Sequence, residues 1–447
     1  ILVCMAFFFT FLRLHEVKVT EKRVFHIAGF IVVALGCGLF TNQIILSDFM
    51  DEHQINIRMF RPMESYQKYG GVLTFARSVG YAVVKKPEGY TTAKVDQIIQ
   101  EYEKKSANAQ QSTAKQYPNI ITVVNETFAD IKVLGDFKTN EDYMPYFHSL
   151  KKNCVTGYTY ASIVGGQTAN TEFELLTGNT LGFLSAGTTA FQLYIHGQMP
   201  SLVSNLKAEG YSGNKAMHPF NPYNYNRPAV YKDFGFTDFI DKFDFPKNVK
   251  RVREYISDEA NVDRIISEYE KNRKKTDQPF YMYNMTIQNH SPYDKDAANF
   301  KQPIKIESSK YDAEANRYLN LIKYSDDSLK QLTGYFEKCK EPTIILFLGD
   351  HQPRLTDEFM NKITNGQYQT WSSEQMMKRY QVPFVIWANY DIKEQHIEKT
   401  SMNYIQSILT KTAGVKMTGY QRFLNEVRKE VPTITSQGYW GKNGKFY

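Results

Sequence analysis

The chain has 447 residues, of which 42% are hydrophobic, and it carries a formal net charge of +7. This length exceeds one average domain, and the hydrophobic content excludes a disordered chain. The modest positive charge, without zinc-finger spacing or a dense Lys/Arg tract, argues against a nucleic-acid-binding protein and suits attraction to anionic surfaces. The four cysteines form no CxxC pair, which argues against a disulfide scaffold.

Two apolar segments open the chain. Residues 1–12 read as the end of a transmembrane helix, and residues 24–46 contain no Lys, Arg, Asp or Glu and are long enough for a second span. The loop between them, residues 13–23, is basic and should be cytoplasmic. The pattern predicts a multi-pass protein of the cell membrane, with a transmembrane region at residues 1–47 and an extracellular remainder.

Residues 48–115 read as an extracellular connector. Val72–Val84 is mildly apolar and amphipathic, and two interpretations of it stay open. It would lie along the membrane surface as an interfacial helix, or pack as a helix on the following domain. A second helix is expected near Val95–Lys105.

From Pro118 onward, short apolar runs alternate with helical patterns, which predicts an α/β domain. The runs that read as buried strands are Ile120–Val124, Phe280–Ile287, Thr343–Leu348 and Val382–Ala388. In the last run, Pro383 suggests an edge strand or the first residue of a strand.

Polar clusters follow the first three of these strands. They are Asn125-Glu126-Thr127, Asn289-His290-Ser291 and Gly349-Asp350-His351. Sites in open α/β sheets form beyond the carboxyl ends of strands, so these clusters should meet. The side chains of Glu126, Asp350 and His351 offer oxygen and imidazole ligands that suit Mg²⁺ or Mn²⁺ and also fit Zn²⁺. Taken singly, none of them is specific, because a lone Glu after a strand is more often a capping or salt-bridge residue and Asp-His occurs by chance in many chains.

The segment Gly165–Gly178 predicts a sharp bend followed by a short helix. Gly165-Gly166 lets the backbone turn, and Thr171 with Glu174 matches a capping box. Thr168 then lies just before a helix whose free backbone N–H groups attract phosphate. Its hydroxyl becomes a nucleophile only beside a base or a metal, and spacing alone favours a capping role.

Four motifs occur in a fixed order: VNETF at 124–128, GGQTANTEFELLTG at 165–178, NHSPY at 289–293 and GDHQP at 349–353. Together they resemble the extracellular catalytic domain of lipoteichoic acid synthases and related phosphoglycerol transferases, which belong to the alkaline phosphatase and sulfatase superfamily. The resemblance covers residues 116–430 and implies a central, mostly parallel sheet flanked by helices, preceded by transmembrane helices. Residues 431–447 would form a C-terminal tail.

The resemblance also assigns roles to individual residues. It implies that a divalent metal, Mn²⁺ or Mg²⁺, is held by Glu126, Thr168, Asp350 and His351, with Thr168 also the nucleophile. It further implies that the substrate's phosphate and glycerol are bound by His290, His218, Arg227 and Tyr225, the last standing where relatives often have Trp. The residues themselves leave open that His218 is a surface residue and that Arg227 forms an ordinary ion pair.

The implied reaction transfers glycerophosphate from phosphatidylglycerol, through Thr168, to a glycerophosphate polymer or glycolipid. One rival is a phosphoethanolamine transferase or phosphodiesterase with the same metal site, although such transferases commonly carry disulfides. A non-enzymatic rival is a homologue that binds glycerophosphate or senses lipid. Sulfatase activity is disfavoured, because Cys154-Val155-Thr156-Gly157-Tyr158 lacks the Pro and Arg of the C/S-x-P-x-R motif.

Overall fold

A computed structural model describes residues 23–47, 49–53, 55, 57, 62–81, 83–84, 86–108, 117–185, 187–307 and 312–447. The chain divides into two compact units: Ile1–Lys85 with Ser185–Thr188, and Lys86–Leu184 with Thr189–Tyr447. The apolar segment at residues 1–12 and most of the predicted cytoplasmic loop lie outside the described residues.

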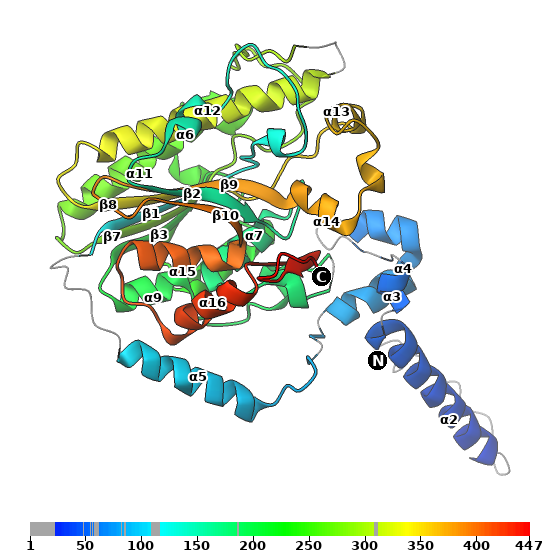
Figure 1. Ribbon diagram of the computed structural model, residues 1–447. Helices are drawn as coiled ribbons and strands as arrows, with labels where there is room; N and C mark the ends of the chain where they lie inside the picture. The colour runs from blue at the N-terminus through cyan, green and yellow to red at the C-terminus, as the bar shows by residue number, and fades with distance from the viewer. Residues whose placement is uncertain are drawn as a thin grey trace. The chain divides into compact units, whose positions relative to one another are not determined.

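The first unit is helical. Its elements are α2 (Arg23–Phe40), the π-helical turn η1 (Thr41–Leu46), α3 (Phe49–Glu52) and α4 (Pro62–Tyr81), drawn in blue in Figure 1. The predicted second span therefore forms α2 and η1. None of the helices in the described part of the chain combines the length and apolar character that crossing a bilayer requires.

The second unit is built on an eight-stranded sheet. In spatial order its strands are β10 (Gln395–Ser401), β2 (Cys154–Tyr160), β9 (Gln381–Ala388), β8 (Thr343–Gly349), β1 (Asn119–Asn125), β7 (Phe280–Met285), β3 (Ser212–His218) and β4 (Asp238–Asp241). β9 is antiparallel to both neighbours, and the other pairings are parallel. This confirms the predicted mostly parallel sheet and the four predicted strands.

The prediction for Pro383 is wrong. β9 lies inside the sheet, between β2 and β8, and Pro383 is neither at an edge nor at the start of the strand. The pairing with β8 stops at Phe384, so a proline at the next position leaves that ladder of hydrogen bonds intact.

Helices cover both faces of the sheet (Figure 1). Alternate residues of β1 enter different cores: Ile120 and Val124 join one, Ile121 and Val123 the other. The first core is covered by α7 (Thr168–Thr177), α9 (Leu202–Ala208), α10 (Arg227–Phe234), α15 (Met402–Thr412) and α16 (Gly419–Glu430). The second is covered by α6 (Pro145–Ser149), α11 (Asp258–Arg273), α12 (Ala313–Phe336) and α13 (Asp357–Ile363).

Smaller elements complete the second unit. The predicted helix near Val95–Lys105 is α5 (Thr92–Ala107), which packs on α16. Residues after 430 form the hairpin β11 (Thr433–Thr435) and β12 (Gly438–Trp440), whose Trp440 is buried. The others are β5 (Arg251–Val252), β6 (Tyr255–Ile256), α8 (Ala190–Leu193), α14 (Ser373–Met376) and the 3₁₀ turns η2 (Ile131–Val133), η3 (Leu181–Phe183), η4 (Asn224–Asn226), η5 (Lys242–Asp244), η7 (Tyr368–Thr370) and η8 (Met377–Tyr380).

Candidate metal centre

Glu126 and Asp350-His351 meet at the carboxyl edge of the sheet. They directly follow the neighbouring parallel strands β1 and β8, whose last residues, Asn125 and Gly349, are in register. One ligand atom from each of the three side chains lies within 4.8 Å of the others. All three side chains are buried, Asp350 completely. The polar clusters predicted after these strands therefore do come together.

Gly349 allows the turn after β1 to fold closely against β8. A Cβ atom at Gly349 would lie 1.8 Å from the carbonyl oxygen of Phe128, a distance that no side chain tolerates. The same turn brings the backbone N–H of Thr127 to within 2.7 Å of Asp350 Oδ1, to which it donates. The close approach of the two backbones thus aligns the carboxylates of Glu126 and Asp350.

Hydrogen bonds hold Asp350 and His351 in fixed orientations. Asp350 Oδ1 accepts from the backbone N–H groups of Thr127 and of His351, at 2.7 and 2.8 Å. His351 Nδ1 lies 3.0 Å from the carbonyl oxygen of Gln352, so it must carry the proton, and Nε2 presents a lone pair. Asp350 Oδ2 and His351 Nε2 are both buried without a hydrogen bond and lie 3.1 Å apart.

Asp350 Oδ2 and His351 Nε2 face each other and neither forms a hydrogen bond, so a cation that binds both atoms would satisfy them. A carboxylate pair with one imidazole suits Mn²⁺ or Mg²⁺ and also matches Zn²⁺ ligation. The unpartnered atoms and the donor set therefore fit a divalent cation.

The electrostatics of Glu126 agree with this fit. Burial raises the pKa of its carboxyl to about 8, and the neighbouring charge of Asp350 adds to the rise. A divalent cation would oppose both causes by stabilising the ionised carboxylate.

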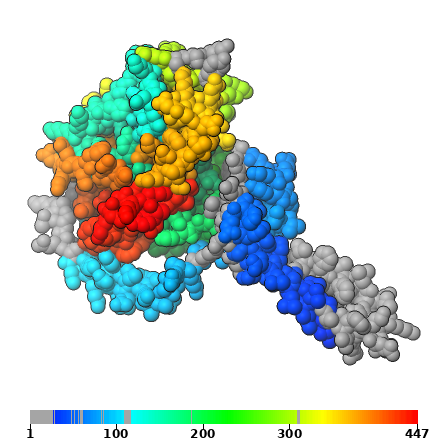
Figure 2. Space-filling view, turned by 45° about the vertical axis from the view of Figure 1, so that its right-hand side comes forward, coloured from blue at the N-terminus to red at the C-terminus, as the bar shows by residue number. Residues whose placement is uncertain are grey.

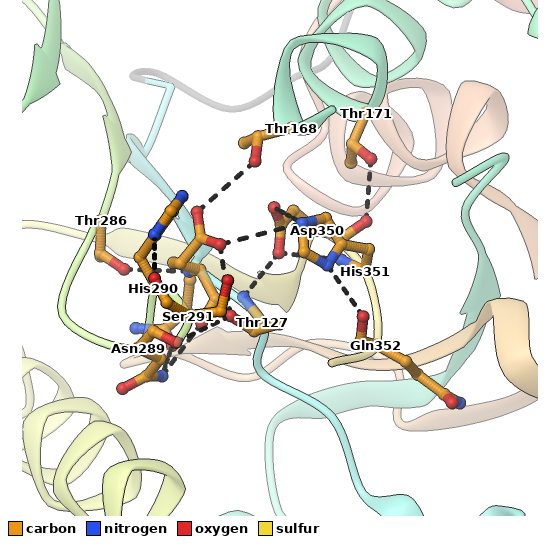
Figure 3. A network of polar contacts seen from close by, with 12 residues as sticks. Thr127, Thr168, Thr171, Thr286, Asn289, His290, Ser291, Asp350, His351 and Gln352 are labelled. Carbon is orange, nitrogen blue, oxygen red and sulfur yellow. Dashed lines mark hydrogen bonds and ion pairs between the residues drawn. The ribbon is translucent and has the colours of Figure 1, made fainter. Parts of the chain in front are cut away.

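Thr168 is the first residue of α7, and its hydroxyl faces the carboxylates. Three residues with positive φ precede it: Gly165 (68°), Gly166 (142°) and Gln167 (68°). They turn the chain so that Thr168 Oγ1 lies 3.5 Å from Glu126 Oε2. In Figure 3 the Thr168 hydroxyl points from its helix toward the polar cluster that contains Asp350 and His351.

The predicted capping box at Thr171 and Glu174 is wrong, because the N-cap is Gln167, four residues earlier than expected. Thr171 lies inside α7, and its hydroxyl donates to the carbonyl oxygen of Asp350 at 2.8 Å. Glu174 accepts hydrogen bonds from Ser162 Oγ and from the backbone N–H of Leu181. Both residues fix α7 against the strand ends, so they position Thr168 indirectly.

A buried network of hydrogen bonds around the Asn289 amide holds the backbone of Glu126 in place. Asn289 Nδ2 lies 3.0 Å from the backbone oxygen of Glu126, 3.0 Å from Asn125 Oδ1 and 2.8 Å from Ser325 Oγ. Asn125 and Ser325 both donate to Asp258 Oδ2, at 2.7 and 2.6 Å. Sequence reasoning missed Asp258 and Ser325, which come from α11 and α12 and carry no local signal.

His218 and His290 are both neutral imidazoles with one nitrogen occupied. His218 Nδ1 donates to the carbonyl oxygen of Met285 at 3.0 Å, and His290 Nδ1 lies 2.7 Å from that of Ser291. Burial lowers the pKa of His290 and lowers that of His218 well below the usual range. His218 is 2% exposed, so it is not a surface residue.

Arg253 holds the loop that carries His290. Its guanidinium donates to the backbone oxygens of Gln288, His290 and Pro292, at 2.7 to 2.9 Å. The ring of Tyr255 lies 5.8 Å from the His290 ring, centroid to centroid. Arg253 sits in the turn between β5 and β6, and no sequence motif pointed to it.

Arg227 does form an ion pair, which the sequence had left open, and the pair is buried. Its Nε and Nη2 donate to Glu172 Oε1 at 3.1 and 2.7 Å, while Nη1 lies 3.5 Å from the Asn224 carbonyl oxygen. Glu172 Oε2 accepts from the hydroxyls of Tyr231 and Tyr283. The pair leaves Nη1 as the guanidinium nitrogen with the weakest contact.

Mutual electrostatic effects connect the remaining predicted residues. Burial is the largest cause of the pKa shifts of Glu126, His218 and His290. The charge of Arg227 opposes the rise at Glu126 and adds to the fall at His218, and the charge of Asp350 opposes the fall at His290. The ring of Tyr225 lies 5.1 Å from the Arg227 guanidinium, and burial raises its pKa to about 12. The predicted site residues thus gather around one edge of the sheet.

Cys154 lies at the opposite edge, because it is the first residue of β2, which runs parallel to β1 and β8. Burial raises the pKa of its thiol to about 12, which removes the thiolate near neutral pH. Its position and its pKa both exclude it as a nucleophile at the metal centre.

Comparison with known proteins agrees with this architecture. A cyclic β-1,2-glucan modification protein assigned in Rhizobium meliloti is 31% identical over 395 residues, which are 87% of this chain and 59% of that protein. A lipoteichoic acid synthase of Staphylococcus saprophyticus is 24% identical, over 77% of this chain and 53% of its own. This chain thus spans a little more than half the length of these relatives.

Two solved structures share the fold. The Streptococcus pyogenes phosphoglycerol transferase GacH, in complex with sn-glycerol-1-phosphate, matches 78% of this chain and 89% of its own, with a TM-score of 0.65 and 20% identity. The lipoteichoic acid synthase LtaP of Listeria monocytogenes matches 78% and 92%, with a TM-score of 0.58 and 20% identity. A family model for sulfatases matches residues 118–415. The chain therefore belongs to the sulfatase family.

Proposed function

We propose that this chain is a metal-dependent phosphotransferase that takes glycerophosphate from phosphatidylglycerol, holds it on Thr168 and passes it to a hydroxyl of a cell-envelope polymer. The observation that carries this proposal is the position of the Thr168 hydroxyl, at the start of α7 and 3.5 Å from Glu126 Oε2, facing the buried cluster. The names of the lipoteichoic acid synthase relatives support the class of reaction.

Glu126, Asp350, His351 and Thr168 would hold the cation. When bound, it would lower the pKa of the Thr168 hydroxyl and shield the charge of the phosphate. The Thr168 oxygen forms a bond to phosphorus while the bond from phosphorus to the diacylglycerol oxygen breaks. The proton lost by Thr168 ends on that departing oxygen, so diacylglycerol leaves as an alcohol.

The other residues would position the substrate. Arg227 Nη1 is available for one phosphate oxygen, while Glu172 fixes the rest of the guanidinium. His218 and His290 donate through Nδ1, so each would offer Nε2 as a hydrogen-bond acceptor to a glycerol hydroxyl. In the second half of the reaction, one of these nitrogens would take the proton of the acceptor hydroxyl. The acceptor oxygen would bond to phosphorus as the bond from phosphorus to Thr168 Oγ1 breaks, and the proton would then pass to the Thr168 oxygen. The ring of Tyr225 would cover the glycerol.

The acceptor would be a glycerophosphate polymer, a glycolipid or a related envelope glycan. The relatives named for lipoteichoic acid synthesis and for modification of a cyclic glucan support this range. Because the donor is a lipid, we place the catalytic domain, residues 116–430, beside the membrane, and the basic loop at residues 13–23 favours the extracellular side for it. The apolar α2 and η1, within the proposed transmembrane region at residues 1–47, would anchor it there.

The test uses the purified full chain, fluorescent phosphatidylglycerol and Mn²⁺, and measures released diacylglycerol. Thr168→Ala should abolish release and leave the fold intact. The matched control is Thr177→Ala on the same helix, whose hydroxyl donates to the carbonyl oxygen of Phe173, and it should retain turnover. Full activity of Thr168→Ala would end the proposal.

Mass spectrometry of the trapped Thr168 adduct distinguishes the rival activities. Glycerophosphate on Thr168 supports the proposal, whereas phosphoethanolamine would identify the chain as a phosphoethanolamine transferase. A chain that binds Mn²⁺ without turning over any lipid would instead be a non-enzymatic homologue.

A further inference from the structure

The second half of α4 presents an apolar side to its surroundings. Gly70 has a non-helical backbone (φ 76°, ψ 170°) and separates this half from the first. Among residues 71–81, those exposed are Gly71, Val72, Phe75 and Val79. Val72 is 71% exposed, Phe75 49% and Val79 39%, and their i, i+3, i+7 spacing places them on one stripe. We call Val72, Phe75 and Val79 the α4 stripe.

The opposite side of this half-helix is polar and buried. Thr74 is 2% exposed, Arg77 4% and Tyr81 0%. The Thr74 hydroxyl donates to the Ser65 carbonyl oxygen, and the Tyr81 hydroxyl contacts both backbone polar atoms of Ile57, at 3.3 and 3.4 Å. This is the reverse of a helix at a water-facing surface. Because these contacts fix the rotation of α4, the outward position of its stripe is specified rather than incidental.

The same unit contains α2, which is apolar on all sides. Four successive residues, Phe30, Ile31, Val32 and Val33, are 58%, 49%, 67% and 56% exposed. Successive helical residues point about 100° apart, so these four face different directions and no single protein groove would cover them all. Hydrocarbon surrounds such a helix without that restriction.

α4 is closely packed on the end of this apolar segment. A Cβ atom at Gly80 would lie 3.1 Å from the backbone oxygen of Ile45 in η1. Exposed Lys68 precedes the α4 stripe and lies over the ring of Tyr69, at 4.9 Å. A lysine and a tyrosine in this arrangement suit the headgroup layer of an anionic bilayer. The surface of this unit is drawn in blue in Figure 2.

We infer that α4 is an interfacial helix whose stripe lies between the headgroups and acyl chains of an anionic phospholipid bilayer. The role of this contact rests on the proposed function, because α4 would keep the enzyme at the membrane surface that contains its lipid donor. It adds a contact that lies outside the metal centre and outside the proposed spans.

The first experiment tests directly whether the α4 stripe lies in the bilayer. Phe75→Trp in the full chain is mixed with vesicles of equal parts phosphatidylglycerol and phosphatidylcholine, the latter brominated near the top of its acyl chains. Quenching of the added fluorescence is expected. The matched control is Ile99→Trp on α5, a residue 53% exposed, which should stay unquenched. An unquenched Trp at position 75, or dimerisation through the stripe that shields it, would overturn the inference.

The second experiment measures how the α4 stripe affects turnover of the lipid donor. Val72→Glu with Phe75→Glu should lower turnover of vesicle phosphatidylglycerol roughly tenfold, because two apolar contacts with lipid are lost. Turnover of dispersed short-chain phosphatidylglycerol should be unchanged, and Ile99→Glu should change neither. Equal losses on both donors, or an equal loss in Ile99→Glu, would overturn the inference. If the unaltered chain cleaves neither donor, the proposed function fails, while the quenching result still decides the position of α4.

Discussion

Two buried charged clusters lie at the same edge of the sheet, and they differ in how their charges are satisfied. Around Arg227, the guanidinium, the Glu172 carboxylate and two tyrosine hydroxyls satisfy one another. Around Asp350, two carboxylates share a space with the His351 imidazole, and Asp350 Oδ2 and His351 Nε2 stay without hydrogen bonds. Burial of charge therefore does not itself indicate a binding site. Unpartnered acceptor atoms that face a common point do indicate one.

Asp350→Asn should have the largest effect, because it removes one negative ligand from the open cluster. We expect loss of bound Mn²⁺ and a fall in donor turnover of roughly a thousandfold or more. Stability without metal should not fall, since the charge of Asp350 contributes to the raised pKa of Glu126. Metal analysis, turnover and urea unfolding measure the three quantities. The control is Asp327→Asn on α12, a residue whose side chain is 61% exposed. Full metal content in Asp350→Asn would refute the claim that the cluster around Asp350 binds a metal.

Glu172→Gln should instead act on stability. It leaves the Arg227 guanidinium buried without a counter-charge, which costs about 3–5 kcal/mol of unfolding free energy. Combining Glu172→Leu with Arg227→Met should recover part of the loss, because no buried charge then remains. Urea unfolding followed by circular dichroism measures both. Glu172→Leu and Arg227→Met are also measured singly, and if the double variant loses as much as these two single variants added together, the pair is not coupled.

A third cluster, more exposed than the other two, should give the smallest effect. His148 Nδ1 lies 2.7 Å from Asp142, and Nε2 lies 3.7 Å from Asp130. The neighbouring carboxylates of Asp130 and Asp142 raise the pKa of His148 from 6.5 to about 9, although burial opposes the rise. The stabilisation is fully present below pH 6.5 and is lost as the pH rises through about 9.

The size of this pH effect is limited by solvent, because the His148 side chain is 36% exposed. We therefore expect it to stay below about 1 kcal/mol. His148→Gln should flatten the dependence of the urea midpoint on pH in this range, whereas His196→Gln, an exposed imidazole near a backbone oxygen, should not. Equal pH profiles for the two variants would refute the assignment.

The sequence predicted the parts of the site that depend on local pattern. Runs of apolar β-branched residues mark β1 and β8, and the residues directly after them necessarily meet where parallel strands end. β3 was not predicted, because SGNKAMH has no such run, and its place beside β7 is set by tertiary packing. His218, its last residue, was found through its motif alone.

Partners distant in the chain could not be predicted. Glu172 and Arg227 are 55 residues apart, and Asn125 and Asp258 are 133 apart, so no spacing rule connects them. The start of α7 was misplaced for a related reason. Gln167 adopts a left-handed conformation at the N-cap, and Thr171 bonds to the Asp350 backbone rather than capping its own helix.

Because Gly349 has no side chain, the turn after β1 can approach β8 closely, and this approach sets the separation of Glu126 and Asp350 in the candidate metal centre. Since the turn after β1 touches the end of β8 backbone to backbone, the distance between the two acidic ligands is inherited from the sheet and not from the ligands' own flexibility. The size of ion that this candidate centre would accept is therefore set by main-chain packing. A lineage that changed this preference would first have to rebuild the turn, and merely exchanging Asp for Glu would not be enough.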